Sequence, residues 1–162
     1  MEYRYIGKSG LRVTPICMGT MSFGSWSDKA ESFKILDTAY DRGINFFDTA
    51  NVYGAMWDAG GLGNTEKILG NWLDEDKSRR DKIVLATKVY GKMGNGPNES
   101  KLSAYHIRKA CEDSLKRMKT DHIDLYQMHH IDRNTPWEEI YQAMEQLIKE
   151  GKIIYVGSSN FD

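Results

Sequence analysis

Three polar side chains that can hold or move a proton follow short apolar segments: Asp48, Lys88 and His129, with Tyr53 soon after the first. A lysine cation close to a tyrosine favours its phenolate form, and a carboxylate keeps the lysine charged and oriented. A tyrosine in such a setting is a tuned general acid. A general acid that faces a carbonyl oxygen, with no nucleophile beside it, suits hydride delivery from a cofactor to the carbonyl carbon.

Other kinds of site have less support in the sequence. A Gly-x-Ser-x-Gly motif is absent, which weakens a serine-hydrolase interpretation, and so is a phosphate-binding Gly-x-x-x-x-Gly-Lys-Ser/Thr loop. His129 and His130 are adjacent, so in a strand they would point to opposite faces. Because no further ligand lies at a suitable spacing, we predict no metal site.

Lys88 at a strand end could instead form a Schiff base in a lyase or aldolase. The nearby Asp48 counts against that alternative, because a carboxylate favours the protonated amine.

Alternating apolar segments and helical periodicity predict a parallel α/β architecture for the elements that position these residues. Residues 3–6 and 11–13 flank Gly7-Lys8-Ser9-Gly10 and predict a hairpin. Core strands are expected at 15–19, 44–47, 83–86, 123–126 and 153–156, with four helices between them. The carboxyl ends of parallel strands converge on one face, so we expect the polar residues that follow them to form one site.

Local signals mark where the helices begin. Ser103 is expected to cap one helix, and Thr135 with Glu138 predicts a capping box for the next. The charged stretch 74–82 is interpreted as a solvated connection. The buried stripe of the last helix is expected at Trp137, Ile140, Met144, Leu147 and Ile148.

Composition narrows the class of protein. The 162 residues fit one domain. Twenty-three acidic against 22 basic residues give a net charge of −1, which does not support nucleic-acid binding or a polybasic membrane patch. There is no apolar run of membrane-helix length and no signal-peptide core. Cys17 and Cys111 lie far apart, which predicts two buried thiols in a reducing cytoplasm.

The sequence resembles the aldo-keto reductase family over essentially its whole length. The segments that carry the resemblance are 18–24, 43–54, 66–70, 87–88, 124–129 and 157–161. They are most similar to the bacterial general-stress-protein-like branch, which also resembles potassium-channel β subunits. The resemblance implies a (β/α)8 TIM barrel and reduction of aldehydes or ketones with NADPH, NADH being the alternative cofactor.

The resemblance also implies roles for individual residues. Tyr53 would be the proton donor, Lys88 would favour its ionisation, and Asp48 would hold Lys88. His129 would orient the substrate carbonyl; it is chosen over His130 because the family's histidine directly follows Leu-Tyr-x-x.

Further residues are implied around this group of four. The cofactor-binding residues would be Gly19, Thr20, Met21, Asp48, Ser159 and Asn160. Of these, Ser159 and Asn160 would bind the nicotinamide carboxamide. Trp26, Trp57 and Tyr90 follow strand ends and are candidates for a substrate pocket, the alternative being loops that pack on themselves.

A complete barrel of this kind takes about 250 residues. We therefore expect residues 1–162 to form a partial barrel of about five parallel strands and four helices, with a hairpin at 3–13. The family's later segment, which grips the adenosine 2′-phosphate and stacks on the nicotinamide, would lie outside it. The first and last core strands would be open edges, which favours self-association. We expect a piece of a longer reductase; the alternative is an inactive or regulatory fragment.

Overall fold

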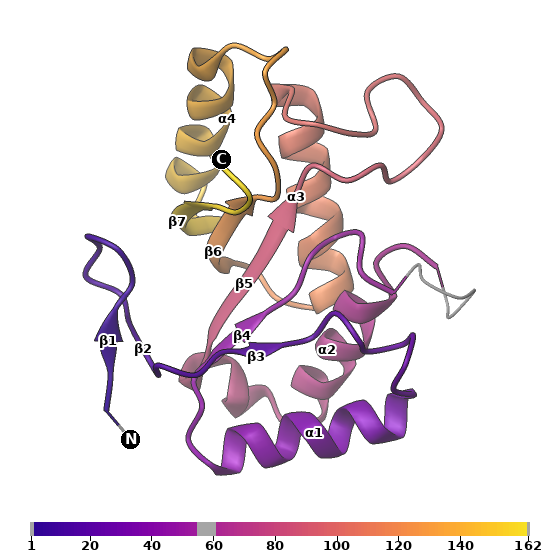
Figure 1. Cartoon of the computed structure of the whole chain (residues 1–162), viewed down its shortest axis with the longest axis vertical. Helices are drawn as coiled ribbons and strands as arrows, with labels where there is room; N and C mark the ends of the chain where they lie inside the picture. Colours follow the sequence, from indigo (N-terminus) through magenta and orange to yellow (C-terminus); the bar gives the residue numbers. More distant parts are fainter. Residues whose placement is uncertain (1, 55–60, 162) are drawn as a thin grey trace.

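A five-stranded parallel sheet forms the core of the computed structural model, which describes residues 2–54 and 61–161 (Figure 1). The strands, in their order across the sheet, are β3 (Met18–Gly19), β4 (Phe46–Asp48), β5 (Val84–Val89), β6 (Ile123–Met128) and β7 (Ile153–Ser158). The helices are α1 (Lys29–Asp41), α2 (Asn64–Glu75), α3 (Ala104–Met118) and α4 (Trp137–Lys149). The predicted partial barrel of five parallel strands and four α-helices is confirmed.

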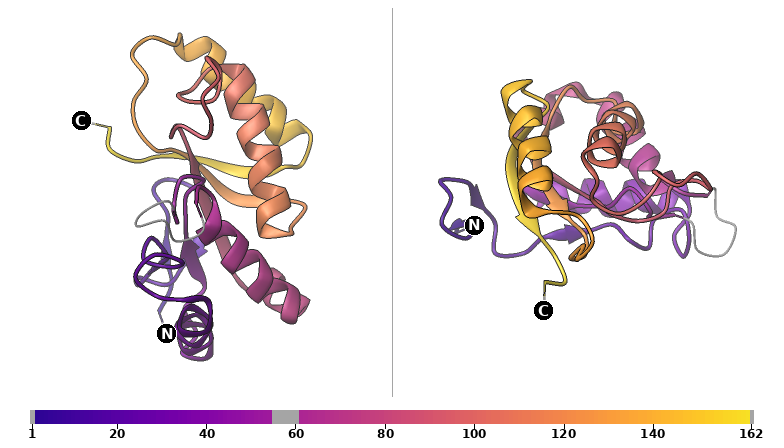
Figure 2. Two further views of the ribbon diagram at one scale, coloured as in Figure 1. Left: turned by 90° about the vertical axis from the view of Figure 1, so that its right-hand side faces the viewer. Right: turned by 90° about the horizontal axis from the view of Figure 1, so that it is seen from above.

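A small antiparallel ribbon precedes this sheet. It consists of β1 (Arg4–Tyr5) and β2 (Arg12–Val13), as the hairpin prediction required. Figure 1 shows the ribbon standing apart from the helices, and Figure 2 shows the helices gathered on one face of the sheet. The loops that follow the strands lie at the carboxyl end of this parallel sheet, so that end is where a site can form.

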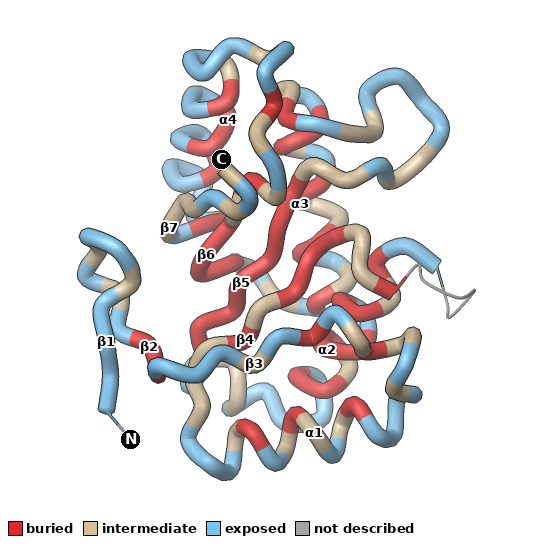
Figure 3. The backbone as a smooth tube through the Cα atoms, viewed as in Figure 1, coloured by how far each residue is buried: buried red, intermediate tan, exposed pale blue. Residues whose placement is uncertain are grey.

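Burial follows the position of each strand in the sheet. All six residues of the central strand β5 are buried, whereas β7 at the edge is buried only at Ile153 (Figure 3). Within the described residues, β3 and β7 are the two edges of the sheet. The predicted open edges are therefore present in this part of the chain.

Close packing joins the helices to each other and to the sheet. The Trp72 ring stacks on Phe47 with ring centroids 5.6 Å apart. Gly70 allows α2 to approach α3, since a Cβ atom there would lie 2.2 Å from the Arg117 carbonyl oxygen. In the same interface the Arg117 guanidinium lies 2.6 Å from the carboxylate of the buried Glu66.

The cap predictions are confirmed for one helix and wrong for another. The Ser103 side chain accepts a hydrogen bond from the backbone N–H of His106 at the start of α3. The capping box at α4 does not form, because Pro136 occupies the cap position and no side chain caps the helix. The Thr135 hydroxyl instead donates to the carboxylate of Asp132. Asp132 is only 3% exposed, and its carboxylate also accepts other hydrogen bonds.

The charged stretch at 74–82 is not simply solvated. Residues Lys77–Lys82 form a 3-10 helix, η2. The Arg79 guanidinium lies 3.1 Å from an Asp37 carboxylate oxygen, and that of Arg80 lies 2.8 Å from Asp124. Both arginine side chains are mostly buried, because their long stems reach back into the protein.

Two burial predictions also need correction. Trp137 and Ile148 are 39% and 43% exposed, because they flank the stripe of α4 that faces the sheet, whereas Ile140, Met144 and Leu147 are buried. Cys17 is exposed because it precedes an edge strand, while Cys111 is buried as expected, and both thiols are free.

None of the helices in the described ranges has the length and apolar character needed to cross a membrane.

Candidate active site

Three neighbouring strands bring the four predicted residues together. Asp48 ends β4, Lys88 lies in β5, and His129 follows β6. The Lys88 ammonium lies 2.5 Å from Asp48 Oδ2, 2.9 Å from the Thr49 carbonyl oxygen and 3.3 Å from the Tyr53 hydroxyl oxygen. These three acceptors match the three N–H donors of an ammonium group.

A tight turn after β4 holds Tyr53 in place. The Tyr53 N–H donates to the carbonyl of Ala50, and the next residue, Gly54, has φ +94°. A side chain at Gly54 would also meet Asn64, with its Cβ 2.7 Å from the Asn64 Cβ. The turn therefore requires glycine directly after Tyr53.

His129 lies against the tyrosine on the side of β6. The two rings pack edge to face, with centroids 5.7 Å apart. Burial, followed by the positive charge of Lys88 and the neighbouring His130, lowers the pKa of His129 to about 4, while Asp48 opposes this shift. His129 is therefore a neutral imidazole at neutral pH, with one N–H donor and one acceptor nitrogen.

The ion pair of Lys88 and Asp48 is largely withdrawn from water. The side chain of Lys88 is 7% exposed and that of Asp48 is 23% exposed. Removing either partner would leave an uncompensated charge in this low-dielectric position. The ion pair is therefore stable in this position only when both side chains and their hydrogen bonds are present.

One polar residue of the site was not predicted. Gln127 donates a hydrogen bond from Nε2 to Asp48 Oδ1 over 2.8 Å. Gln127 is a polar residue near the end of an otherwise mainly apolar strand segment, just before His129. That position was a usable signal for a site residue, but it did not identify Asp48 as the partner.

The proposed cofactor residues lie on both sides of this group. On one side, Gly19 pairs with Asp48 in the sheet, and the backbone N–H and hydroxyl of Thr20 both donate to the Asp48 carbonyl. Thr20 is fully buried, so its hydroxyl serves this internal contact, while the neighbouring Met21 is 49% exposed.

On the other side, residues after β7 contact the loop of His129. Asn160 Nδ2 donates to the His129 carbonyl oxygen at 2.9 Å and lies 3.0 Å from Ser159 Oγ. The Ser159 N–H donates to the Met128 carbonyl. The Asn160 amide oxygen has no hydrogen bond within the described ranges, so an acceptor next to the site remains available for an amide ligand.

The three pocket candidates differ in their positions. The Tyr90 ring lies 5.2 Å from that of His130, which stacks on His129 at 5.0 Å, so Tyr90 extends the aromatic contacts of the site. His129 and His130 do not point to opposite faces as predicted, because β6 ends at Met128 and strand alternation ends with it.

The two tryptophan candidates are not brought to the four central residues. Trp26 is 64% exposed and lines a hollow near the N-terminal ends of α1 and α2, together with Asp28 and Asn64. Trp57 lies outside the described residues.

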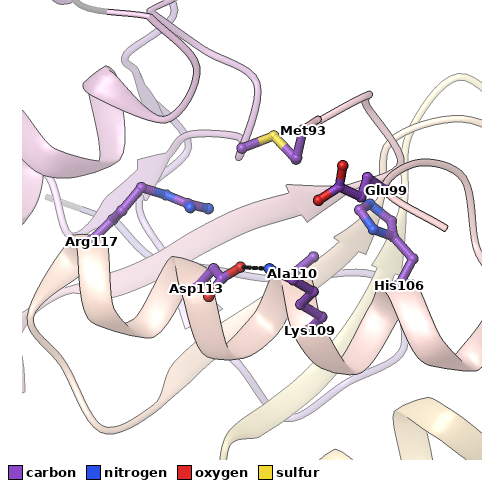
Figure 4. Close-up of a pocket in the computed structure, with 7 residues that line it drawn as sticks. All are labelled: Met93, Glu99, His106, Lys109, Ala110, Asp113 and Arg117. Atoms are coloured by element: carbon purple, nitrogen blue, oxygen red, sulfur yellow. Dashed lines mark hydrogen bonds and ion pairs between the residues drawn. The ribbon is translucent and has the colours of Figure 1, made fainter. Parts of the chain in front are cut away.

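A separate small cavity of about 80 Å³ lies beside α3 (Figure 4). It is lined by Met93, Glu99, His106, Lys109, Ala110, Asp113 and Arg117. Its opposite charges largely neutralise one another: Lys109 pairs with Asp113 at 2.7 Å, and burial lowers the pKa of His106. None of the four predicted catalytic residues lines it, so we treat it as distinct from the candidate active site.

Comparisons with known proteins place the chain in a family. The sequence profile described as "Aldo/keto reductase family" matches residues 15–162. The chain is 54% identical to "Uncharacterized oxidoreductase YrpG" of Bacillus subtilis over 99% of the chain and 50% of that protein. It is 38% identical to "Probable voltage-gated potassium channel subunit beta" of Arabidopsis thaliana, over 99% of the chain and 47% of that protein.

A third relative is "L-glyceraldehyde 3-phosphate reductase" of Escherichia coli, which is 37% identical over 99% of the chain and 46% of its own length. The chain therefore spans about half the length of the curated relatives it matches.

Proposed function

The chain belongs to the aldo/keto reductase family. On that premise we propose that it acts as an oxidoreductase that reduces aldehydes or ketones to alcohols. NADPH is the proposed hydride donor and NADH the alternative. The observation that carries the proposal is the Lys88 ammonium, which lies within hydrogen-bond distance of Asp48, Thr49 and Tyr53 at once.

This arrangement prepares Tyr53 to give up a proton. Lys88 donates a hydrogen bond to the phenol oxygen, so the phenol proton is free to point towards another acceptor. As the substrate carbonyl gains a hydride at carbon, its π bond breaks and its oxygen takes the Tyr53 proton. The Lys88 cation then stabilises the phenolate that remains.

His129 is proposed to orient the carbonyl. Its depressed pKa keeps the imidazole neutral at pH 7, so it offers an N–H hydrogen bond rather than a charge. Its edge-to-face contact with Tyr53 places it beside the proton donor. We expect it to hold the carbonyl oxygen within reach of the phenol, which is a positional contribution to the rate.

The proposed cofactor would lie between the ends of β3 and β7. The available Asn160 amide oxygen fits a carboxamide N–H, with Ser159 beside it and Gly19 and Met21 on the opposite side. Asp48 and Thr20 would stabilise this surface, because the Thr20 hydroxyl donates a hydrogen bond to the Asp48 backbone carbonyl. A bound nicotinamide supplies the hydride.

The decisive test is NADPH oxidation at 340 nm by residues 1–162 with a reactive aromatic aldehyde. Tyr53→Phe removes the proton donor, and we expect it to lose most turnover while keeping cofactor binding. Tyr105→Phe is the matched control, because Tyr105 is 64% exposed on α3. Full activity in Tyr53→Phe would refute the assignment of the proton donor.

A Schiff-base lyase that uses Lys88 has less support, because Lys88 already donates to three acceptors and is paired with a carboxylate. Borohydride trapping of a carbonyl substrate on Lys88 would favour it over the reductase. A regulatory role without turnover is the other alternative, since one relative is named as a channel subunit. Absence of NADPH oxidation across a panel of carbonyls would favour that role.

We also propose that the chain self-associates through its open sheet edges. Support comes from β7, where Ile154 is 47% exposed, and from the neighbouring Ile148 on α4 at 43%. Edge strands with exposed apolar side chains invite pairing with another chain. Light scattering should show a species larger than a monomer that Ile154→Lys dissociates; a monomeric wild type would refute the proposal.

The cytoplasm is the proposed location, because both cysteines are free thiols. Recovery of the chain in the cytoplasmic fraction of its native cells would support this, and recovery from an oxidising compartment would refute it.

A further inference from the structure

Gln127 makes a contact that the four-residue scheme leaves out. Its amide N–H donates to Asp48 Oδ1 at 2.8 Å, while Asp48 Oδ2 accepts from Lys88. The two oxygens of the carboxylate therefore have different partners on different strands. A carboxylate held at both oxygens cannot rotate away from the ammonium without breaking a hydrogen bond.

The sheet register places Gln127 for this contact. Gln127 pairs with Lys88 on β5 and with Gly157 on β7. A Cβ atom at Gly157 would lie 3.1 Å from the Gln127 Cγ, so the absence of a side chain there leaves room for the glutamine. Both the donor and the space it needs are thus built into adjacent strands.

We propose that Gln127 is a positioning residue for the reaction, acting through Asp48 to keep the Lys88 ammonium aimed at Tyr53. This inference rests on the proposed reductase function and adds to it a fifth residue. Gln127 does not have to touch substrate or cofactor in this role. Its amide is neutral, so it restrains the carboxylate without competing for the charge of Lys88.

Two substitutions separate positioning from simple loss of packing. Gln127→Leu keeps a side chain of similar size and removes the donor. Gln127→Glu introduces a carboxyl that donates to Asp48 only when it is protonated, and that repels Asp48 when ionised. Gln127 contacts Asp48 on β4 and pairs with Lys88 on β5. The other titratable groups that act on this ion pair are Tyr53, His129 after β6, and Cys17 before β3.

Kinetics should report the effect as a change in turnover. We expect Gln127→Leu to lower kcat by about tenfold or more at all pH values, with little change in KM, because it misplaces the proton-transfer groups. The activity of Gln127→Glu, as a ratio to wild type, should recover as the pH falls from 8 to 5. A purely structural role predicts no such recovery.

The matched control is Gln142→Leu, because Gln142 is exposed on α4. It should retain wild-type kcat and pH profile. Gly157→Ala offers a second perturbation that leaves Gln127 chemically intact, and we expect a smaller loss of kcat in the same direction, since the glutamine must shift by a few tenths of an ångström.

A second readout does not depend on turnover. The ¹⁵Nζ resonance of Lys88 should be observable by NMR in wild type and in Gln142→Leu, because a restrained ammonium exchanges its protons slowly. It should broaden or vanish in Gln127→Leu and return in Gln127→Glu at low pH. If wild type shows no turnover, the reductase proposal fails for this chain, while the Lys88 resonance still decides whether Gln127 positions Lys88. An unchanged resonance in Gln127→Leu would overturn the inference.

Discussion

The buried charge of Glu66 lies beside β5, the strand that carries Lys88, and removal of its partner should destabilise the fold. The Glu66 side chain is completely buried, and its carboxylate accepts from Arg117 Nε and from the Thr87 hydroxyl, both at 2.6 Å. Arg117 is itself 15% exposed and also donates to Ser114 at 3.1 Å. Arg117→Met keeps most of the apolar stem and deletes the cation.

The expected cost is large because Glu66 cannot reach water. Removing one partner of a buried ion pair costs about 3–5 kcal/mol in the free energy of unfolding. For a domain of this size that corresponds to a fall in Tm of roughly 10 °C. Combining Arg117→Met with Glu66→Gln should recover part of the loss, because the double variant leaves no unpaired charge.

Urea unfolding followed by circular dichroism measures these differences. Lys116→Met is the matched control, since Lys116 is a neighbouring lysine whose side chain is 75% exposed and pairs loosely with Asp113 at 3.7 Å. Its ion pair should contribute less than about 0.5 kcal/mol. A cost below about 1 kcal/mol for Arg117→Met, or strict additivity in the double variant, would refute the reasoning.

Two further predictions concern stability. The pKa of His129 is about 4 in the folded chain against an ordinary 6.5, so between these values the unfolded chain binds a proton that the folded chain does not. Wild-type stability should therefore fall with falling pH in that window, by at most about 3 kcal/mol. His129→Gln should lose this dependence in urea titrations at pH 4 to 7; an unchanged slope would contradict it. Gly70→Ala should destabilise by about 2 kcal/mol or more, since its Cβ would lie 2.2 Å from the Arg117 carbonyl. Thermal melts measure this loss, and Gly10→Ala, which has open space around it, should be nearly neutral in them; equal effects of the two substitutions would refute the packing argument.

Periodicity in the sequence was enough to predict the architecture. Apolar segments that alternate with amphipathic helices predict parallel strands in chain order, and β3 to β7 follow that order. The polar residues after these segments predict a common site, and Asp48, Lys88 and Tyr53 do form hydrogen-bonded contacts. These predictions succeed because strand direction alone decides which end of a parallel sheet a residue occupies.

Contacts between side chains on different strands could not be predicted in the same way. The capping box at Thr135 failed because a buried Asp132 lies close enough to take the hydroxyl. The stacking of His129 on His130 depends on where β6 ends, and strand boundaries are weakly marked in a sequence.

The sequence alone therefore determined the order of the elements and the end of the sheet where the polar residues gather. Only the tertiary structure decided that Gln127 meets Asp48 and that Gly157 leaves room for it. The physical reason is that a hydrogen bond depends on distances of a few tenths of an ångström between atoms on separate strands, and register and packing set those distances.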